Sequence, residues 1–244
     1  MPPPKYLAQA NQLIAALPED SRVSFLRHCQ LVSVQRQEVL TQSGESAEYA
    51  YFPVDSYVAV VLNMANLNDI QVDLTGNEGA VNVSLVLGVR VATLTSTVQG
   101  AGRAFRIHYI ELQKLLEIDP VLRSVLNLYV TLRMDQLARN MACSSFHGVE
   151  QRLARWLLMV RDRGHSNELL LTQEQLSRML GVRRESVTQA ASTLQKKDLI
   201  SYSRGDLTLL NQPGLEAAAC SCYEADLEVF KRAMLSLKVM PDVK

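Results

Sequence analysis

The sequence predicts an α+β protein in which an N-terminal antiparallel β barrel or jelly roll precedes a mainly helical C-terminal part. Between Val32 and His108, short runs of alternating apolar and polar residues are separated by turn signals such as Gly76-Asn77. From Asp119 onward, apolar residues recur at steps of three and four, which indicates helices. Short strands with frequent turns followed by helices are typical of a closed β domain joined to a helical one.

The composition is that of an ordinary globular protein. The chain has 244 residues, of which 48% are hydrophobic and 20% charged, so it is long enough for one large domain or two smaller ones. The formal net charge is zero, so any surface that binds nucleic acid has to be a local patch. No apolar run reaches the roughly 18 residues of a membrane span, and we expect no membrane contact and a cytoplasmic location.

A long helix is predicted from Pro120 to about Ser144. Asp119 is a good N-cap, proline is favoured at the first helical position, and the segment contains no internal Gly or Pro. The helix carries two apolar stripes, and a helix that is apolar on two faces has to cover its own domain and something else. We expect a second copy of the chain to pack on it, or alternatively a single larger core to bury it. The residues assigned to this dimer helix are Leu122, Val125, Tyr129 and Leu132; the other stripe is Leu126, Val130, Met134, Leu137 and Met141.

The segment LTQEQLSRMLGVRRESVTQAASTLQKKDLISYSRGDLTLL predicts two helices followed by a β hairpin. Thr172 and Gln175 form a capping box that begins the first helix, and Gly181 suits the short turn to the second. The hairpin turns at Arg204-Gly205-Asp206. Two helices joined by a short turn and followed by a hairpin make a winged helix-turn-helix. The second helix buries Val187, Ala190, Ala191 and Leu194.

The outward face of this unit has the chemistry to bind double-stranded DNA. The N-terminal residues of a recognition helix reach base edges in the major groove, and Arg, Glu and Gln side chains pair with particular bases. Side chains around them contact phosphates, which position a protein without specifying sequence. The alternative is a ligand-sensing interaction module that docks on a partner protein without DNA. The expected base-contacting residues are Arg184, Glu185, Thr188 and Gln189; the expected phosphate-contacting residues are Thr172, Gln173, Arg183, Ser186, Lys196, Lys197 and Arg204.

The helix-turn-helix segment, with its Arg184-Glu185 pair, resembles the signature of the Crp–Fnr family of transcription regulators. The YFPVDSYVAVV and GNEGAVNVSLVLG segments resemble the N-terminal sensory barrel of one branch of that family. The resemblance covers nearly the whole chain. It implies a cyclic-nucleotide-binding-like jelly roll at residues 1–118, a dimerisation helix at 119–147 and a winged helix-turn-helix domain at 148–244. It also implies a homodimer on a pseudo-palindromic operator and contact with RNA polymerase.

Two departures from the family pattern affect what the chain is expected to bind. The ribose-binding carboxylate and phosphate-binding arginine of the cyclic-AMP-binding members are replaced by uncharged residues at 81–83 and 94–96. A buried phosphate without a charged partner is costly, so we expect an effector other than cyclic AMP. Glu78 and Arg90 are candidate effector-binding residues, or surface residues of turns. Gln189 stands where the best-known members have Arg, which predicts a changed operator preference.

No metal, cofactor or enzyme activity is expected. The cysteines at 29, 143, 220 and 222 form no CxxC pair and no histidine follows at zinc-site spacing, so we expect reduced cysteines used for packing, with a redox role for Cys220 and Cys222 left open. Cys29 stands alone where an iron–sulfur branch of the family has a cluster. Haem has candidate ligands only by residue type, at His28, Cys29 and His108. The sequence contains no HExxH, P-loop or GxSxG motif.

Overall fold

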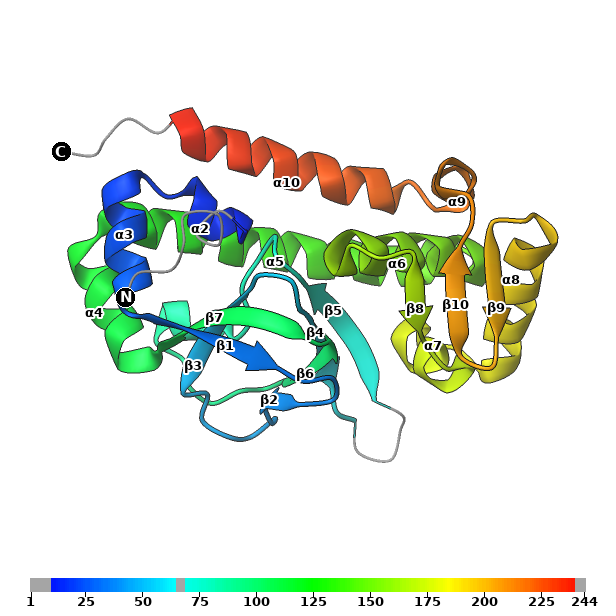
Figure 1. Cartoon of the computed structure of the whole chain (residues 1–244), viewed down its shortest axis with the longest axis horizontal. Coiled ribbons are helices and arrows are strands. Elements are labelled where there is room, and N and C mark those ends of the chain that lie inside the picture. The colour runs from blue at the N-terminus through cyan, green and yellow to red at the C-terminus, as the bar shows by residue number, and fades with distance from the viewer. Residues whose placement is uncertain (1–9, 65–68, 240–244) are drawn as a thin grey trace.

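The computed structural model describes residues 10–64 and 69–239 and places a β domain under a layer of long helices (Figure 1). Helices α2 (Gln12–Ala16) and α3 (Glu19–Arg27) precede two antiparallel sheets, with strand orders β1-β7-β3 and β2-β6-β4-β5. The jelly-roll expectation is confirmed. The strands are β1 (Cys29–Val34), β2 (Val39–Thr41), β3 (Tyr49–Pro53), β4 (Tyr57–Leu62), β5 (Ile70–Thr75), β6 (Thr95–Gly100) and β7 (Gly102–His108).

Helix α5 (Pro120–Phe146) runs along the β domain and begins as predicted. The Asp119 carboxylate caps it by accepting hydrogen bonds from the backbone N–H groups of Val121 (3.0 Å) and Leu122 (2.9 Å). The helix ends two residues beyond the predicted Ser144. Before it come the short 3₁₀ helix η1 (Val83–Leu87) and helix α4 (Tyr109–Ile118), neither of which the sequence analysis assigned.

Most of the stripe on α5 that was predicted to form the dimer contact faces the β domain of the same chain. Leu122, Val125 and Tyr129 are only 1%, 3% and 1% exposed, because they pack into the core of the chain's own β domain. Leu132, the fourth member, is half-buried and lines a cavity beneath helix α10 (Cys222–Val239). Side chains already buried in one chain cannot contact a second copy, so the assignment of Leu122, Val125 and Tyr129 to the dimer contact is corrected, and that of Leu132 stays a prediction. The other stripe supplies three exposed apolar residues of α5, Met134, Leu137 and Met141, and Phe146 at the end of the helix is exposed as well.

The C-terminal domain follows α5 after the short junction at His147-Gly148. It comprises α6 (Val149–Gly164), β8 (Glu168–Leu170), α7 (Gln173–Leu180), α8 (Arg184–Lys196), β9 (Ile200–Ser203), β10 (Asp206–Leu209) and α9 (Gln212–Ala218). Ala59 and Leu74 of the β domain belong to the same apolar core as α6, α7 and α8. The two parts of the chain are therefore packed against each other and not merely tethered.

Helix α10 (Cys222–Val239) returns along α5 (Figure 1) and was not predicted. Its Asp226 carboxylate forms ion pairs with Arg139 of α5 (2.6 Å) and Arg155 of α6 (2.5 Å). Tyr223 donates a hydrogen bond to Asp162 of α6 (2.8 Å). Charged and polar contacts thus hold much of α10 in place. No helix within residues 10–64 and 69–239 is both long and apolar enough to cross a membrane.

Candidate nucleic-acid interface

The turn between α7 and α8 has the geometry of a helix-turn-helix. Thr172 accepts a hydrogen bond from the backbone N–H of Gln175 (3.2 Å), and the Gln175 side chain accepts one from the Thr172 N–H (2.8 Å), which is the predicted capping box. Gly181 ends α7 in the left-handed region at φ +62°. A Cβ at this position would lie 2.9 Å from the side chain of Ile70 in β5. Glycine is therefore required both by the turn and by the contact with the β domain.

Helix α8 buries Val187, Ala190, Ala191 and Leu194 as the spacing predicts, and this fixes which residues face outward. The four residues expected to contact bases are all exposed: Arg184, Glu185, Thr188 and Gln189. The structure also gives Gln173 of α7 a role that the sequence did not suggest. Its side-chain oxygen accepts hydrogen bonds from Arg184 Nε (3.2 Å) and the Thr188 hydroxyl (3.1 Å). Gln173 thus holds two of the expected base-contacting side chains in place.

The residues expected to contact phosphate differ in their exposure and in the contacts that they already make within the chain. Lys197 forms an ion pair with Glu150 of α6 (2.6 Å), which has to loosen before Lys197 can reach a phosphate. The Thr172 hydroxyl already serves the helix cap. Gln173 and Ser186 are half-buried, whereas Arg183, Lys196 and Arg204 are exposed.

The wing is a three-stranded sheet in the order β8-β10-β9, one strand more than predicted. Its hairpin turns through Arg204 (φ +52°) and Gly205 (φ +95°), between the paired residues Ser203 and Asp206. Two positive φ values are typical of the two-residue turns that match the twist of antiparallel strands. The turn places Arg204 at the tip of the wing.

Several contacts connect the wing and the helix-turn-helix to the β domain. Arg36 donates a hydrogen bond to the backbone oxygen of Leu170 in β8 (2.7 Å). Arg163 of α6 pairs with Glu78 (2.8 Å), and both side chains are largely buried. These contacts join the β domain to the wing and to α6, the helix on which α8 packs.

The candidate effector residues Glu78 and Arg90 have separate surroundings. Glu78 is engaged by Arg163 and lines a cavity of about 190 Å³ between the β domain, α5, α6 and α10. Arg90 is exposed and lies over the ring of Tyr109, 5.0 Å from its centroid, and it is not among the residues lining that cavity.

Residues 81–83 and 94–96, where the family resemblance leads us to expect the cyclic-AMP-binding groups, belong to a neutral polar network. Asn82, at φ +62°, donates hydrogen bonds to the Thr41 hydroxyl (2.7 Å) and to the backbone oxygen of Tyr49 (2.8 Å). The Ser96 hydroxyl donates to the Asn82 side-chain oxygen (3.4 Å). Thr41 and Ser96 are buried. These side chains therefore pair with one another and carry no charge for a phosphate.

A capped helix, a glycine turn, a second helix with a polar outer face and a hairpin wing define a winged helix-turn-helix protein. Comparison with known proteins agrees with this class. Residues 151–218 match the family described as the Crp-like helix-turn-helix domain. The chain is 22% identical over 189 residues to the cAMP-activated global transcriptional regulator CRP of Pasteurella multocida, covering 72% of this chain and 88% of that protein. The CRP protein of Escherichia coli O157:H7 is 23% identical over 191 residues, with the same coverage.

Solved structures share the fold. The c-di-GMP-responsive global regulator CLP of Xanthomonas campestris superposes with a TM-score of 0.65 at 16% identity, covering 80% of this chain and 100% of that one. FixK2 of Bradyrhizobium japonicum gives a TM-score of 0.64 at 16% identity, covering 79% and 98%. Residues 151–218 thus match a Crp-like helix-turn-helix domain, and the chain as a whole shares the fold of these solved regulators.

Proposed function

We propose that the chain is a homodimeric regulator that reads a pseudo-palindromic operator through helix α8. The observation that carries this proposal is the outer face of α8, where Arg184, Glu185, Thr188 and Gln189 are exposed together at the start of the helix. Gln173 holds Arg184 and Thr188, so part of the entropy cost of ordering these side chains is already met before DNA binds. Arg204 at the tip of the wing and Lys196 at the end of α8 supply phosphate contacts.

The second copy packs against the exposed stripe of α5. Met134 is 65% exposed, Leu137 38% and Met141 71%, and they are spaced by three and four residues along one face. In a twofold dimer the same patch serves both partners, so each residue contributes twice. This arrangement sets the two recognition helices, α8 of each copy, about one turn of DNA apart, roughly 34–36 Å.

The β domain senses an effector other than cyclic AMP. Asn82, Thr41 and Ser96 occupy the region of the cassette with neutral hydrogen bonds, and desolvating a phosphate there without a cationic partner is unfavourable. An effector acts by shifting the population of dimers toward the spacing that fits the operator. Contact with RNA polymerase and a cytoplasmic location complete the proposal.

Selection from a pool of random duplexes tests the proposal. Purified protein is expected to retain a palindromic sequence, and Gln189 is expected to alter it from the family's usual half-site. The affinity is expected to fall steeply as the salt concentration rises, because phosphate contacts release counterions. Recovery of the usual family half-site would contradict the role of Gln189, and retention that ignores salt would contradict DNA binding through this face.

A further inference from the structure

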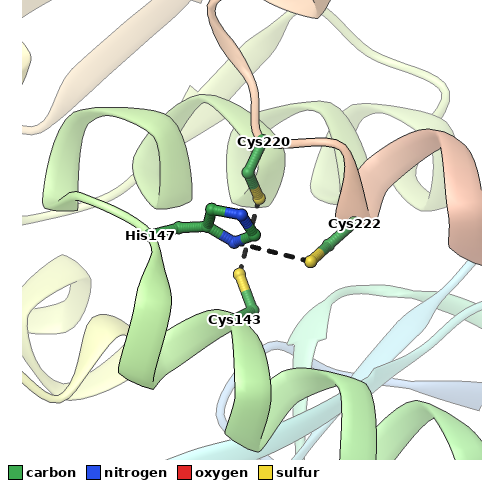
Figure 2. Close-up of side chains that lie close together, drawn as sticks. All are labelled: Cys143, His147, Cys220 and Cys222. Atoms are coloured by element: carbon green, nitrogen blue, oxygen red, sulfur yellow. Dashed lines mark hydrogen bonds between the residues drawn. The ribbon is translucent and has the colours of Figure 1, made fainter.

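Three cysteines and one histidine from two distant segments meet where α5 ends (Figure 2). Cys143 lies on the last turn of α5 and His147 is the C-cap residue of that helix, whereas Cys222 begins α10 and Cys220 lies two residues before it. The four atoms able to bind a metal all lie within 4.8 Å of one another. Cys143 Sγ is 3.4 Å from Cys220 Sγ, and Cys222 Sγ is 3.6 Å from His147 Nδ1.

We propose that Cys143, His147, Cys220 and Cys222 bind one zinc ion in a tetrahedral site. Thiolate and imidazole are the preferred ligands of Zn²⁺, and three cysteines with one histidine are a common structural set. With Zn–S bonds of about 2.3 Å, neighbouring ligand atoms of a tetrahedral centre lie roughly 3.5–3.8 Å apart. The two distances above are close to that range, so the chain needs little movement to close around an ion.

The burial of the ligands indicates a closed, structural site. Cys143, Cys220 and Cys222 are 2%, 4% and 9% exposed, and His147 is half-buried. Four protein ligands complete a tetrahedron and leave no position for water or substrate, as structural zinc sites require.

Two other uses of these cysteines fit the geometry less well. A disulfide needs sulfur atoms about 2.05 Å apart, and joining Cys143 to Cys220 would leave Cys222 and His147 without a role. An iron–sulfur cluster distributes its ligands over two or more irons, whereas these four converge on a single point.

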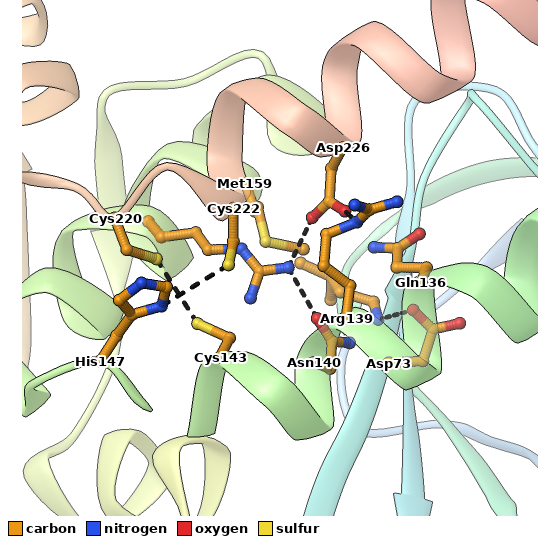
Figure 3. A network of polar contacts seen from close by, with 12 residues as sticks. Asp73, Gln136, Arg139, Asn140, Cys143, His147, Met159, Cys220, Cys222 and Asp226 are labelled. Atoms are coloured by element: carbon orange, nitrogen blue, oxygen red, sulfur yellow. Dashed lines mark hydrogen bonds and ion pairs between the residues drawn. The ribbon is translucent and has the colours of Figure 1, made fainter. Parts of the chain in front are cut away.

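The surrounding charge favours the ion. Zinc with three thiolates carries a net charge of about −1, and buried charge needs a partner. The Arg155 guanidinium is 7% exposed, interacts with Cys143, and donates hydrogen bonds to Asn140 (2.6 Å) and Asp226 (2.5 Å). Figure 3 shows Asn140 and Asp226 beside the cysteine cluster. The Arg155 Nε has no hydrogen-bond partner among the described residues. Arg155 is therefore placed to compensate the negative site.

The position of the cluster gives the ion a mechanical effect. Cys143 and Cys220 are 77 residues apart in the sequence. The ion joins the end of α5, directly before the junction to α6, to the start of α10, so it fixes how α10 lies along the other two helices. Closing so long a loop removes much conformational freedom from the unfolded chain.

Metal analysis of the purified full-length chain tests the site. After dialysis, we expect one zinc ion per chain in the wild type, and less than a tenth of that in Cys220→Ser and in His147→Ala. Cys29→Ser is the matched control, because Cys29 is a free cysteine on β1 outside the cluster, and it is expected to keep its zinc. Zinc retained by both cluster variants, or lost from the control alone, would overturn the proposal.

Cobalt substitution of the wild type keeps the test independent of whether a variant folds. Co²⁺ in the site is expected to show the strong visible bands of tetrahedral coordination and near-ultraviolet thiolate charge transfer, and added Zn²⁺ is expected to abolish both. The weak bands of octahedral cobalt would overturn the proposal. Acid-labile sulfide in the isolated protein, or a Cys143–Cys220 disulfide detected by mass spectrometry, would overturn it as well.

Discussion

Replacing Asp226 by Asn is expected to lower the stability of the protein markedly. The Asp226 carboxylate on α10 forms ion pairs with Arg155 (2.5 Å) and Arg139 (2.6 Å), and these two arginine side chains are only 7% and 27% exposed. Removing one partner of a buried pair usually costs about 3–5 kcal/mol. We place Asp226→Asn at the lower end, about 3 kcal/mol, because Asn140 still accepts a hydrogen bond from Arg155 (2.6 Å) and Arg139 keeps some access to water.

Urea unfolding followed by circular dichroism measures this loss. With a slope of about 3 kcal/mol per molar urea, the midpoint is expected to fall by roughly 1 M. Glu228→Gln is the matched control on the same helix, since Glu228 pairs with Arg232 and those side chains are 50% and 79% exposed. Such exposed pairs contribute at most about 0.5 kcal/mol. Equal midpoints for the two variants would refute the claim that a buried ion pair holds α10 against α5 and α6.

Three further predictions concern the interface and its support. Arg184→Ala is expected to cost about 1–3 kcal/mol of binding free energy on the specific operator and little on random duplexes, whereas Lys196→Ala is expected to weaken binding to both alike. Fluorescence anisotropy measures these affinities, and equal losses of affinity for both variants on both DNAs would refute the assignment. Met134→Lys places a charge in the proposed dimer contact, and light scattering is expected to show that the dissociation constant of the dimer rises at least tenfold, since each buried methionine contributes about 1.5–3 kcal/mol. An unchanged dissociation constant would exclude this face. Gly181→Ala is expected to lose about 1–2 kcal/mol, because its φ of +62° is strained for alanine, while Gly148→Ala, at φ −66°, loses less; equal denaturation midpoints would show that this turn is unstrained.

The sequence predicted the elements whose signals are local. Asp119 and Pro120 marked the start of α5, and the Thr172–Gln175 capping box marked that of α7. The spacing of Val187 to Leu194 gave the buried side of α8, and so its exposed face. Capping, glycine turns and helical periodicity all act within a few residues, which is why sequence alone captures them.

Features that depend on distant partners were missed. Both stripes of α5 are apolar, so periodicity could not decide that Tyr129 faces the β domain and Met134 the exterior. Helix α10 is held partly through Asp226 and Tyr223, and polar contacts of this kind leave no clear apolar stripe in the sequence.

The cysteine cluster was missed for a related reason. Cys143 with His147, and Cys220 with Cys222, each form only half of a ligand set, and neither half has a familiar zinc spacing. The available signal was that residues four apart lie on one helix face, so the first pair could bind a common ion. What the sequence could not supply was the return of α10 to the end of α5.

Selection from random duplexes, with wild type and Arg184→Ala in parallel, tests the central claim most directly. The account predicts that the wild type enriches a pseudo-palindrome with half-sites about one helical turn apart, and that Arg184→Ala loses discrimination at one base pair in each half-site. Performing the selection with purified protein and again in cell extract supplies any effector that is needed. Failure to enrich any sequence under both conditions, by protein that is folded and dimeric, would contradict the account.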